Sequence, residues 1–83
     1  MADINVEQTV KEVLAQQLNI DVNTIKLESR LSEDLGLDSF GAVEMAFALE
    51  EKFGLKISDD AIYTAKIVKD IVDYIFNQLF PKG

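Results

Sequence analysis

The apolar residues of the N-terminal segment recur every three or four positions, which is the spacing of one helix face. They are Val6, Val10, Val13, Leu14 and Leu18, with Gln17 on the same side. Asn5 has a side chain suited to the N-cap, and Gln8 follows three residues later at the capping-box position. Asn19 tolerates the left-handed conformation that ends many helices. The pattern predicts a first helix over residues 6–18 whose apolar face belongs to the core.

Two further helices are predicted toward the C-terminus. Ser58, Asp59 and Asp60 favour the start of a short helix that reaches about Thr64. A last helix follows and is expected to end near Pro81, because proline cannot continue it. Its apolar face consists of Val68, Ile71, Val72, Ile75 and Leu79.

A longer helix is predicted over residues 39–53, and one of its sides is suited to the core. At 100° per residue, a set of apolar residues falls within a sector of about 100°. The set consists of Ala42, Met45, Ala46, Leu49 and Phe53. This stripe is expected to pack against the other helices.

The opposite side of this helix mixes large apolar residues with carboxylates. Phe40, Val43 and Phe47 share it with Glu44 and Glu51. Buried carboxylates without partners are costly, so this side is expected to face water and to leave its apolar residues exposed. Exposed apolar residues rimmed by charge favour a docking surface. The alternative is that Phe40 and Phe47 tuck under the preceding loop.

Residues 20–37 lose the helical periodicity but are too apolar for a disordered linker. Their apolar side chains are Ile25, Leu27, Leu31, Leu35 and Leu37. A long ordered loop that crosses the bundle and contributes to its core is therefore expected. Together the elements predict an all-α fold, a four-helix bundle with three longer helices, one short helix and a long ordered loop between the first two.

Length and composition limit what the chain can be. Its 83 residues are expected to form a single domain, 1–83, around one compact core. The absence of Cys excludes a disulfide framework and a thiolate metal site. No apolar run approaches the ~20 residues that span a bilayer. The first five residues also lack the layout of a signal peptide, so we expect a cytoplasmic monomer without membrane insertion.

The net charge of −7 is concentrated in the middle of the sequence. Residues 28–60 contain nine acids and three bases, a net charge of −6, whereas residues 61–83 carry +1. An acidic segment repels nucleic acid, whose binding depends on Lys and Arg contacts to phosphate. It is suited to attract proteins with basic patches. The alternative interpretation is that the charge only keeps a small domain soluble.

Ser39 is the residue of greatest chemical interest. It follows Asp38 at the start of the middle helix, where free amides and the positive end of the helix dipole favour a phosphate group. The chain has neither His nor Cys, so no imidazole can activate Ser39 as a nucleophile and no catalytic residue is expected. Ser39 is instead expected to be modified by another enzyme, with Asp38 in a supporting role. The alternative is an ordinary capping arrangement.

The acidic turn before Ser39 does not match familiar metal or hydrolase motifs. An EF-hand loop that starts at Asp34 would place Ser39 sixth and Met45 twelfth, where Gly and Glu are required. A hydrolase elbow needs Gly two residues before the serine, where Leu37 stands, and a His elsewhere. Only carboxylates are available as strong metal ligands, so no metal site is expected.

The sequence around Ser39 closely resembles the acyl carrier protein family. The similar stretch is Glu33-Asp34-Leu35-Gly36-Leu37-Asp38-Ser39-Phe40, followed by Val43-Glu44 and Ala48-Leu49-Glu50-Glu51-Lys52-Phe53-Gly54. The resemblance implies that a phosphopantetheinyl transferase, using coenzyme A and Mg²⁺, attaches 4′-phosphopantetheine to Ser39. Acyl groups would then be carried as thioesters on the terminal thiol of this arm. It also implies that acyl-loading and acyl-processing enzymes with basic patches dock at Phe40, Val43, Glu44, Phe47 and Glu51.

Several positions depart from the usual pattern of that family. Phe40 replaces a common Leu, and Gly41 replaces an acid that is frequent in fatty-acid carriers. Lys66-Ile67 replaces the Thr pair that commonly opens the last helix, which predicts a weaker cap there. Ile62 and Ala65 resemble an exchange of a large and a small core residue.

These departures leave the cargo open. The predicted function is a non-catalytic carrier of acyl intermediates, either in fatty-acid synthesis or in specialised lipid or polyketide synthesis. The stretch Asp38-Ser39-Phe40-Gly41 also resembles the local motif of D-alanyl carrier proteins, so an aminoacyl carrier is the alternative within the carrier class. The alternative from a different class is an unmodified acidic helical interaction module.

Overall fold

The computed structural model describes residues 5–80, apart from the side chain of Asp59. The described residues form the helices α1 (Val6–Leu18), α2 (Ser39–Phe53), α3 (Asp59–Thr64) and α4 (Val68–Leu79), with a 3₁₀ turn η1 (Val22–Thr24). The predicted all-α class and the predicted bounds of α1, α2 and α3 are confirmed. Pro81 and residues 1–4, which carried the expectations about the end of the last helix and about a signal peptide, lie outside the described residues.

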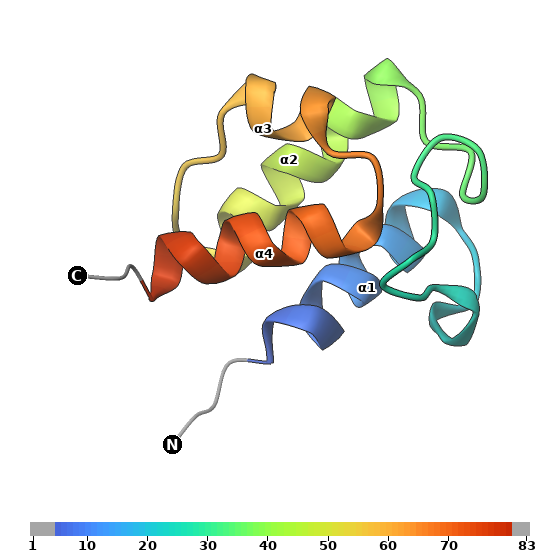
Figure 1. The fold of residues 1–83 in the computed structure, drawn as a ribbon, viewed down its shortest axis with the longest axis horizontal. Helices are drawn as coiled ribbons and strands as arrows, with labels where there is room; N and C mark the ends of the chain where they lie inside the picture. The colour runs from blue at the N-terminus through green and yellow to red at the C-terminus, as the bar shows by residue number, and fades with distance from the viewer. Residues whose placement is uncertain (1–4, 81–83) are drawn as a thin grey trace.

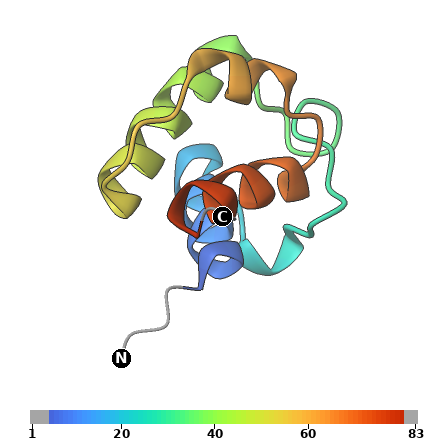
Figure 2. The same ribbon diagram turned by 60° about the vertical axis from the view of Figure 1, so that its left-hand side comes forward.

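Within residues 5–80, no helix is both long enough and apolar enough to cross a membrane. The helices instead pack side by side. Helix α1 contacts both α2 and α4, and the short helix α3 contacts the same two helices (Figures 1 and 2). The largest fully buried side chains come from α1, α2 and α4: Val10, Leu14, Met45, Leu49, Val68 and Ile75.

The ends of α1 explain its length. The Asn5 Oδ1 atom accepts a hydrogen bond from the Gln8 amide at 3.0 Å, and Asn19 takes the left-handed conformation at φ 57°. The reciprocal half of the predicted capping box is absent, because the Gln8 side chain donates to Glu12 Oε2 at 3.2 Å instead. Asn5 and Asn19 therefore set the two ends of the helix, as their positions in the sequence predicted.

The loop between α1 and α2 is ordered and belongs to the core, as predicted. Ile25, Leu31 and Leu37 are buried, and Leu27 and Leu35 pack half-buried against the core. The loop runs beside the start of α4 (Figure 1). An isolated antiparallel bridge pairs Arg30 with Ile67 there. The attachment of the loop to α4 was not predicted.

The N-cap residue of α4, Ile67, makes no side-chain hydrogen bond to the helix, which agrees with the weaker cap expected there. Other groups complete it. The Val68 amide donates to the Ser29 carbonyl at 3.1 Å, and the Lys69 amide donates to the Leu27 carbonyl at 2.9 Å. The loop thus satisfies two amides that a helix start otherwise leaves without partners.

Candidate functional site

Ser39 lies at the surface as the first residue of α2. Asp38 is the N-cap, and its Oδ1 atom accepts a hydrogen bond from the Gly41 amide at 2.7 Å. The Asp38 carbonyl accepts from the Ala42 amide at 2.8 Å. The amides of Ser39 and Phe40 have no acceptor among residues 5–80. This donor set fits a phosphate group bound to the serine hydroxyl.

The preceding turn fixes the position of Ser39. Gly36 adopts φ 73°, a conformation that glycine accepts without steric cost. The Leu37 amide then donates to the Leu31 carbonyl at 2.8 Å, and the Leu37 side chain is buried. Leu37 is thus anchored in the core two residues before Ser39. This anchor fixes where the chain reaches the surface and α2 begins.

The acidic turn is tied together by one arginine. The Arg30 amide donates to Asp34 Oδ2 at 2.8 Å, and the Arg30 guanidinium lies 2.8 Å from a Glu33 oxygen and 3.3 Å from an Asp34 oxygen. The hydrogen bond from the Arg30 amide, followed by that from its guanidinium, holds the pKa of the Asp34 carboxyl below its ordinary value. In the described part of the chain, no three acids converge on a possible metal position.

A groove of about 330 Å³ lies beside Ser39, and we call it the Ser39 groove. Its lining residues come from the loop, α2 and α3: Leu31, Ser32, Leu37, Asp38, Ser39, Ala42, Ile62 and Tyr63. Ser32 and Tyr63 were not singled out from the sequence, because neither belongs to an apolar stripe or a motif. Tyr63 is 57% exposed, so its ring stands at the edge of the groove.

The five residues predicted for docking lie on α2, and we call them the α2 surface. Phe40 is 73% exposed and Phe47 is 64% exposed, so the alternative that they tuck under the loop is wrong. Glu44 and Glu51 are exposed, whereas Val43 is half-buried and contributes less surface than expected. The fold therefore leaves two aromatic rings beside two carboxylates in water.

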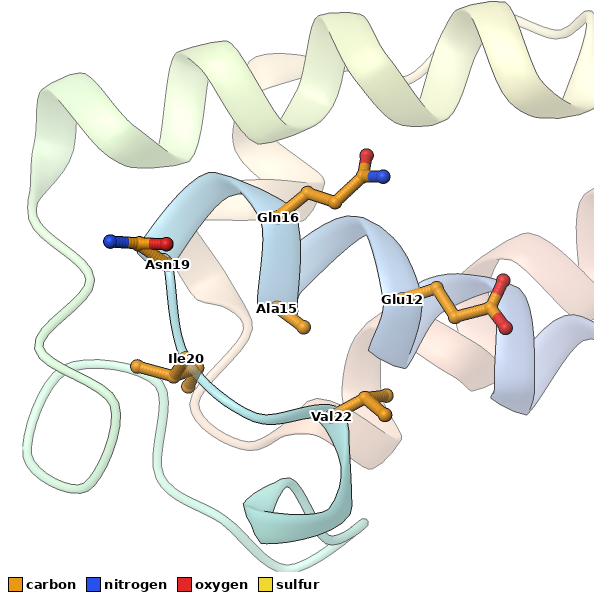
Figure 3. A pocket seen from close by; sticks show the side chains of 6 residues that line it. All are labelled: Glu12, Ala15, Gln16, Asn19, Ile20 and Val22. Carbon is orange, nitrogen blue, oxygen red and sulfur yellow. The ribbon is translucent and has the colours of Figure 1, made fainter.

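A second pocket, of about 410 Å³, lies where α1 meets η1, away from Ser39. Its lining residues are Glu12, Ala15, Gln16, Asn19, Ile20 and Val22 (Figure 3). In Figure 3 the amide of Asn19 points away from the side chains of Glu12 and Gln16. Because these polar groups do not converge, the pocket is a weaker candidate site than the Ser39 groove.

Known proteins are similar to this sequence. Residues 8–75 match the family described as "Phosphopantetheine attachment site". An acyl carrier protein of Phytoplasma mali is 52% identical over 68 residues, which cover 82% of this chain and 81% of that protein. One of Helicobacter hepaticus is 48% identical over 68 residues, with coverages of 82% and 90%. One of Campylobacter hominis is 40% identical over 74 residues, with coverages of 89% and 94%.

The chain therefore belongs to the phosphopantetheine-attachment family. Within that class it is a member of the acyl carrier proteins, as the sequence around Ser39 predicted. Its cofactor is a covalently attached 4′-phosphopantetheine. Proteins of this class are carriers rather than catalysts, and they interact with the enzymes that modify them and process their acyl groups.

Proposed function

We propose that Ser39 carries the 4′-phosphopantetheine arm and that residues 1–83 act as one non-catalytic carrier domain. The observation that carries this proposal is the position of Ser39. Its hydroxyl is exposed at the first residue of α2, where the Ser39 and Phe40 amides lack partners among the described residues. These two amides and the helix dipole would stabilise a phosphodiester at that point.

The chain's own residues hold and present the serine. Asp38 binds the Gly41 amide and so fixes the first turn of α2 without occupying the two amides nearest to Ser39. The base for the Ser39 proton is proposed to come from the transferase, because the chain has no His or Cys and the neighbouring Asp38 carboxylate already accepts the Gly41 amide. The phosphopantetheine donor would be coenzyme A, with Mg²⁺ supplied at the transferase. The arm then carries the acyl group as a thioester.

Partner enzymes would dock on the α2 surface. Phe40 and Phe47 offer aromatic side chains that can enter apolar pockets of a partner, which is the usual way in which few residues supply most of the binding energy. Glu44 and Glu51 would face Lys and Arg side chains of the partner and speed the encounter. The phosphopantetheinyl transferase and the acyl-loading and acyl-processing enzymes are the proposed partners.

The cargo is proposed to be an acyl intermediate of fatty-acid synthesis or of specialised lipid or polyketide synthesis in the cytoplasm. The names of the relatives favour an acyl cargo over an aminoacyl one. A competition between an acyl-carrier synthetase and amino-acid ligases for the modified protein distinguishes the two. Preferential aminoacylation would overturn the acyl assignment and leave the carrier role intact.

The attachment site is tested by intact-protein mass after incubation with coenzyme A, Mg²⁺ and a broad-specificity phosphopantetheinyl transferase. The parent protein should gain one phosphopantetheine, and Ser39→Ala should gain none. Ser32→Ala is the matched control, because Ser32 lines the same groove but belongs to the loop. Modification that persists in Ser39→Ala would contradict the site. No gain in the parent, when a known carrier is converted, would favour an unmodified interaction module.

A further inference from the structure

A groove lies where α1 packs against α2, and we call it the α1–α2 groove. It has a volume of about 370 Å³ and is lined by Val13, Gln16, Ala48, Glu51 and Lys52. Val13 is buried and Ala48 is half-buried, so the floor of the groove is apolar. Gln16, Glu51 and Lys52 are exposed and form a polar rim. Figure 3 shows the Gln16 side chain extending from α1 toward α2.

A hydrogen bond joins the two helices beside this groove. The Gln17 Nε2 atom donates to Glu44 Oε1 at 3.4 Å. Gln17 lies one turn after Val13 on α1, and Glu44 lies one turn before Ala48 on α2, so the bond follows the same line of contact between the helices. It holds the Glu44 carboxylate toward α1. Both carboxylates of the α2 surface therefore border the line where α1 and α2 meet.

The charges along this line favour a cation from a partner. Glu44 and Glu51 contribute two negative charges, and Lys52 contributes one positive charge. Lys52 forms no ion pair within residues 5–80 and lies in the last turn of α2, where the helix carbonyls favour a cation. An arginine suits the groove best. Its aliphatic stem can cover an apolar floor while its guanidinium donates both to a carboxylate and to an amide carbonyl.

We propose that an arginine side chain of the phosphopantetheinyl transferase enters the α1–α2 groove, an inference that rests on the proposed function. The guanidinium binds the Glu51 carboxylate and the Gln16 side-chain carbonyl, and the stem packs on Val13 and Ala48. The docking surface thus extends beyond the α2 surface onto α1. Ala48 lies about 13 Å from Ser39 along the helix axis, at 1.5 Å per residue. The contact therefore acts on binding and not on the transfer itself.

The side-chain amides of glutamine make this contact visible by NMR. Ser39→Ala cannot accept the arm, so its complex with a broad-specificity transferase and coenzyme A persists during the measurement. The side-chain signals of Gln16 and Gln17 should shift or broaden when the transferase is added, as should the backbone amide of Phe47 on the α2 surface. Gln8 is the matched control, because it lies in the first turn of α1 and donates to Glu12 instead.

Lys52 makes the sign of the charge effect testable. Its ammonium lines the groove and opposes a second cation there. Lys52→Gln should therefore lower the KM of the transferase for the carrier by about twofold to fivefold at low salt, the range of one exposed charge contact. The value of kcat should stay unchanged. Lys56→Gln is the matched control and should lower KM by less, because Lys56 is equally exposed but does not line the groove.

The outcomes separate the two proposals. If the parent protein gains no arm by intact mass, both the proposed function and the groove contact are overturned. If the arm is gained and the Phe47 amide responds, but Gln16 and Gln17 change no more than Gln8, only the groove contact is overturned. Equal changes of KM in Lys52→Gln and Lys56→Gln would likewise overturn the binding of a cation in the groove.

Discussion

At the scale of single residues, Gly41 shows how closely the start of α2 is packed. A Cβ atom at this position would lie 3.2 Å from Asp38 Oδ1 and 3.2 Å from Leu37 Cδ1. Asp38 caps the helix, and Leu37 is buried in the wall of the Ser39 groove. A side chain at position 41 would therefore press on both residues that position Ser39, which gives a physical reason for a glycine inside a helix.

The replacement Gly41→Ala tests this account. At an open helix position the change would stabilise the protein by about 1 kcal/mol, because alanine favours the helix more than glycine does. Here the crowding of Asp38 and Leu37 opposes that gain, so we expect the free energy of unfolding to rise by clearly less. Denaturant unfolding measures this change in free energy. The control is the same substitution in a Leu37→Val background, which removes the Leu37 Cδ1 atom that the new side chain would crowd. The full gain of an open position would show that no crowding exists.

Residue exposure on α2 was predictable in part. The angles of an ideal helix placed Phe40 and Phe47 opposite the core, and both are exposed. The same angles did not foresee that Val43 would be half-buried. These angles describe one helix alone and do not include the elements that pack against it. The exposure of residues at the edge of the apolar face of a helix depends on the elements that pack beside that helix.

At the scale of elements, the start of α4 depends on Asp70 as well as on the loop. The Asp70 carboxylate accepts hydrogen bonds from the Lys66 amide at 2.9 Å and from the Ile67 amide at 3.2 Å. Asp70→Ala should lower the free energy of unfolding by about 1 kcal/mol, the usual cost of a lost cap. Thermal or denaturant unfolding measures the change.

Asp73→Ala is the matched control, because Asp73 lies on the same helix and its carboxylate, among residues 5–80, contacts only Lys69 in an exposed ion pair. Such pairs contribute roughly 0–1 kcal/mol, so this variant should lose less stability than Asp70→Ala. Equal losses in the two variants would mean that the α4 start is held by the loop carbonyls and that Asp70 adds nothing of its own.

The sequence pattern of the α1–α2 loop predicts that the loop is buried but not which element it contacts. Its apolar content predicted burial, since five apolar side chains cannot all remain in water, and Ile25, Leu31 and Leu37 are indeed buried. Nothing in residues 20–37 indicated which element the loop would contact. That choice is made by the backbone carbonyls of Leu27 and Ser29, which every residue type possesses. The Ser39 groove could not be predicted either, because it forms only where the loop, α2 and α3 come together.

The acidic turn of this loop gives a prediction about pH. Because the Arg30 contacts lower the pKa of Asp34 in the folded state, Asp34 contributes stability above its unfolded pKa, about 3.9. That contribution is lost as the pH falls through the lower folded value. Asp34→Asn should therefore melt at a lower temperature than the parent near neutral pH, and the difference should shrink in acid. A difference that stays constant from neutral to strongly acidic pH would contradict the role of the ionised carboxylate.

At the scale of the whole molecule, most of the negative charge lies in the same segment as Ser39 and the α2 surface. Residues 28–60, which carry a net charge of −6, include Ser39 and the whole α2 surface. Under the proposed docking on the α2 surface, the field of this segment would orient a basic partner before contact and raise the association rate by about tenfold or more at low salt. We therefore propose that the acidic composition acts on how fast a partner finds the carrier, and that the exposed aromatic residues act on how long the complex lasts.

The double variant Glu44→Lys, Glu51→Lys tests whether the charges on α2, rather than the net charge of the protein, attract the partner enzyme. Both side chains are exposed, so the fold should tolerate the change. We expect kcat/KM of the phosphopantetheinyl transferase to fall on the order of tenfold at low salt. The loss should be smaller at high salt, because salt screens exposed charges beyond about 10 Å at 0.1 M.

Glu12→Lys, Glu28→Lys is the control, because it changes the net charge by the same amount at exposed positions outside α2. If kcat/KM falls only for the α2 variant, the transferase meets the α2 surface and the charges there guide it. If both variants slow equally, the partner responds to net charge alone and the α2 surface has no special part in the encounter. If neither slows at any salt concentration, the acidic segment does not steer, and docking must depend on Phe40 and Phe47.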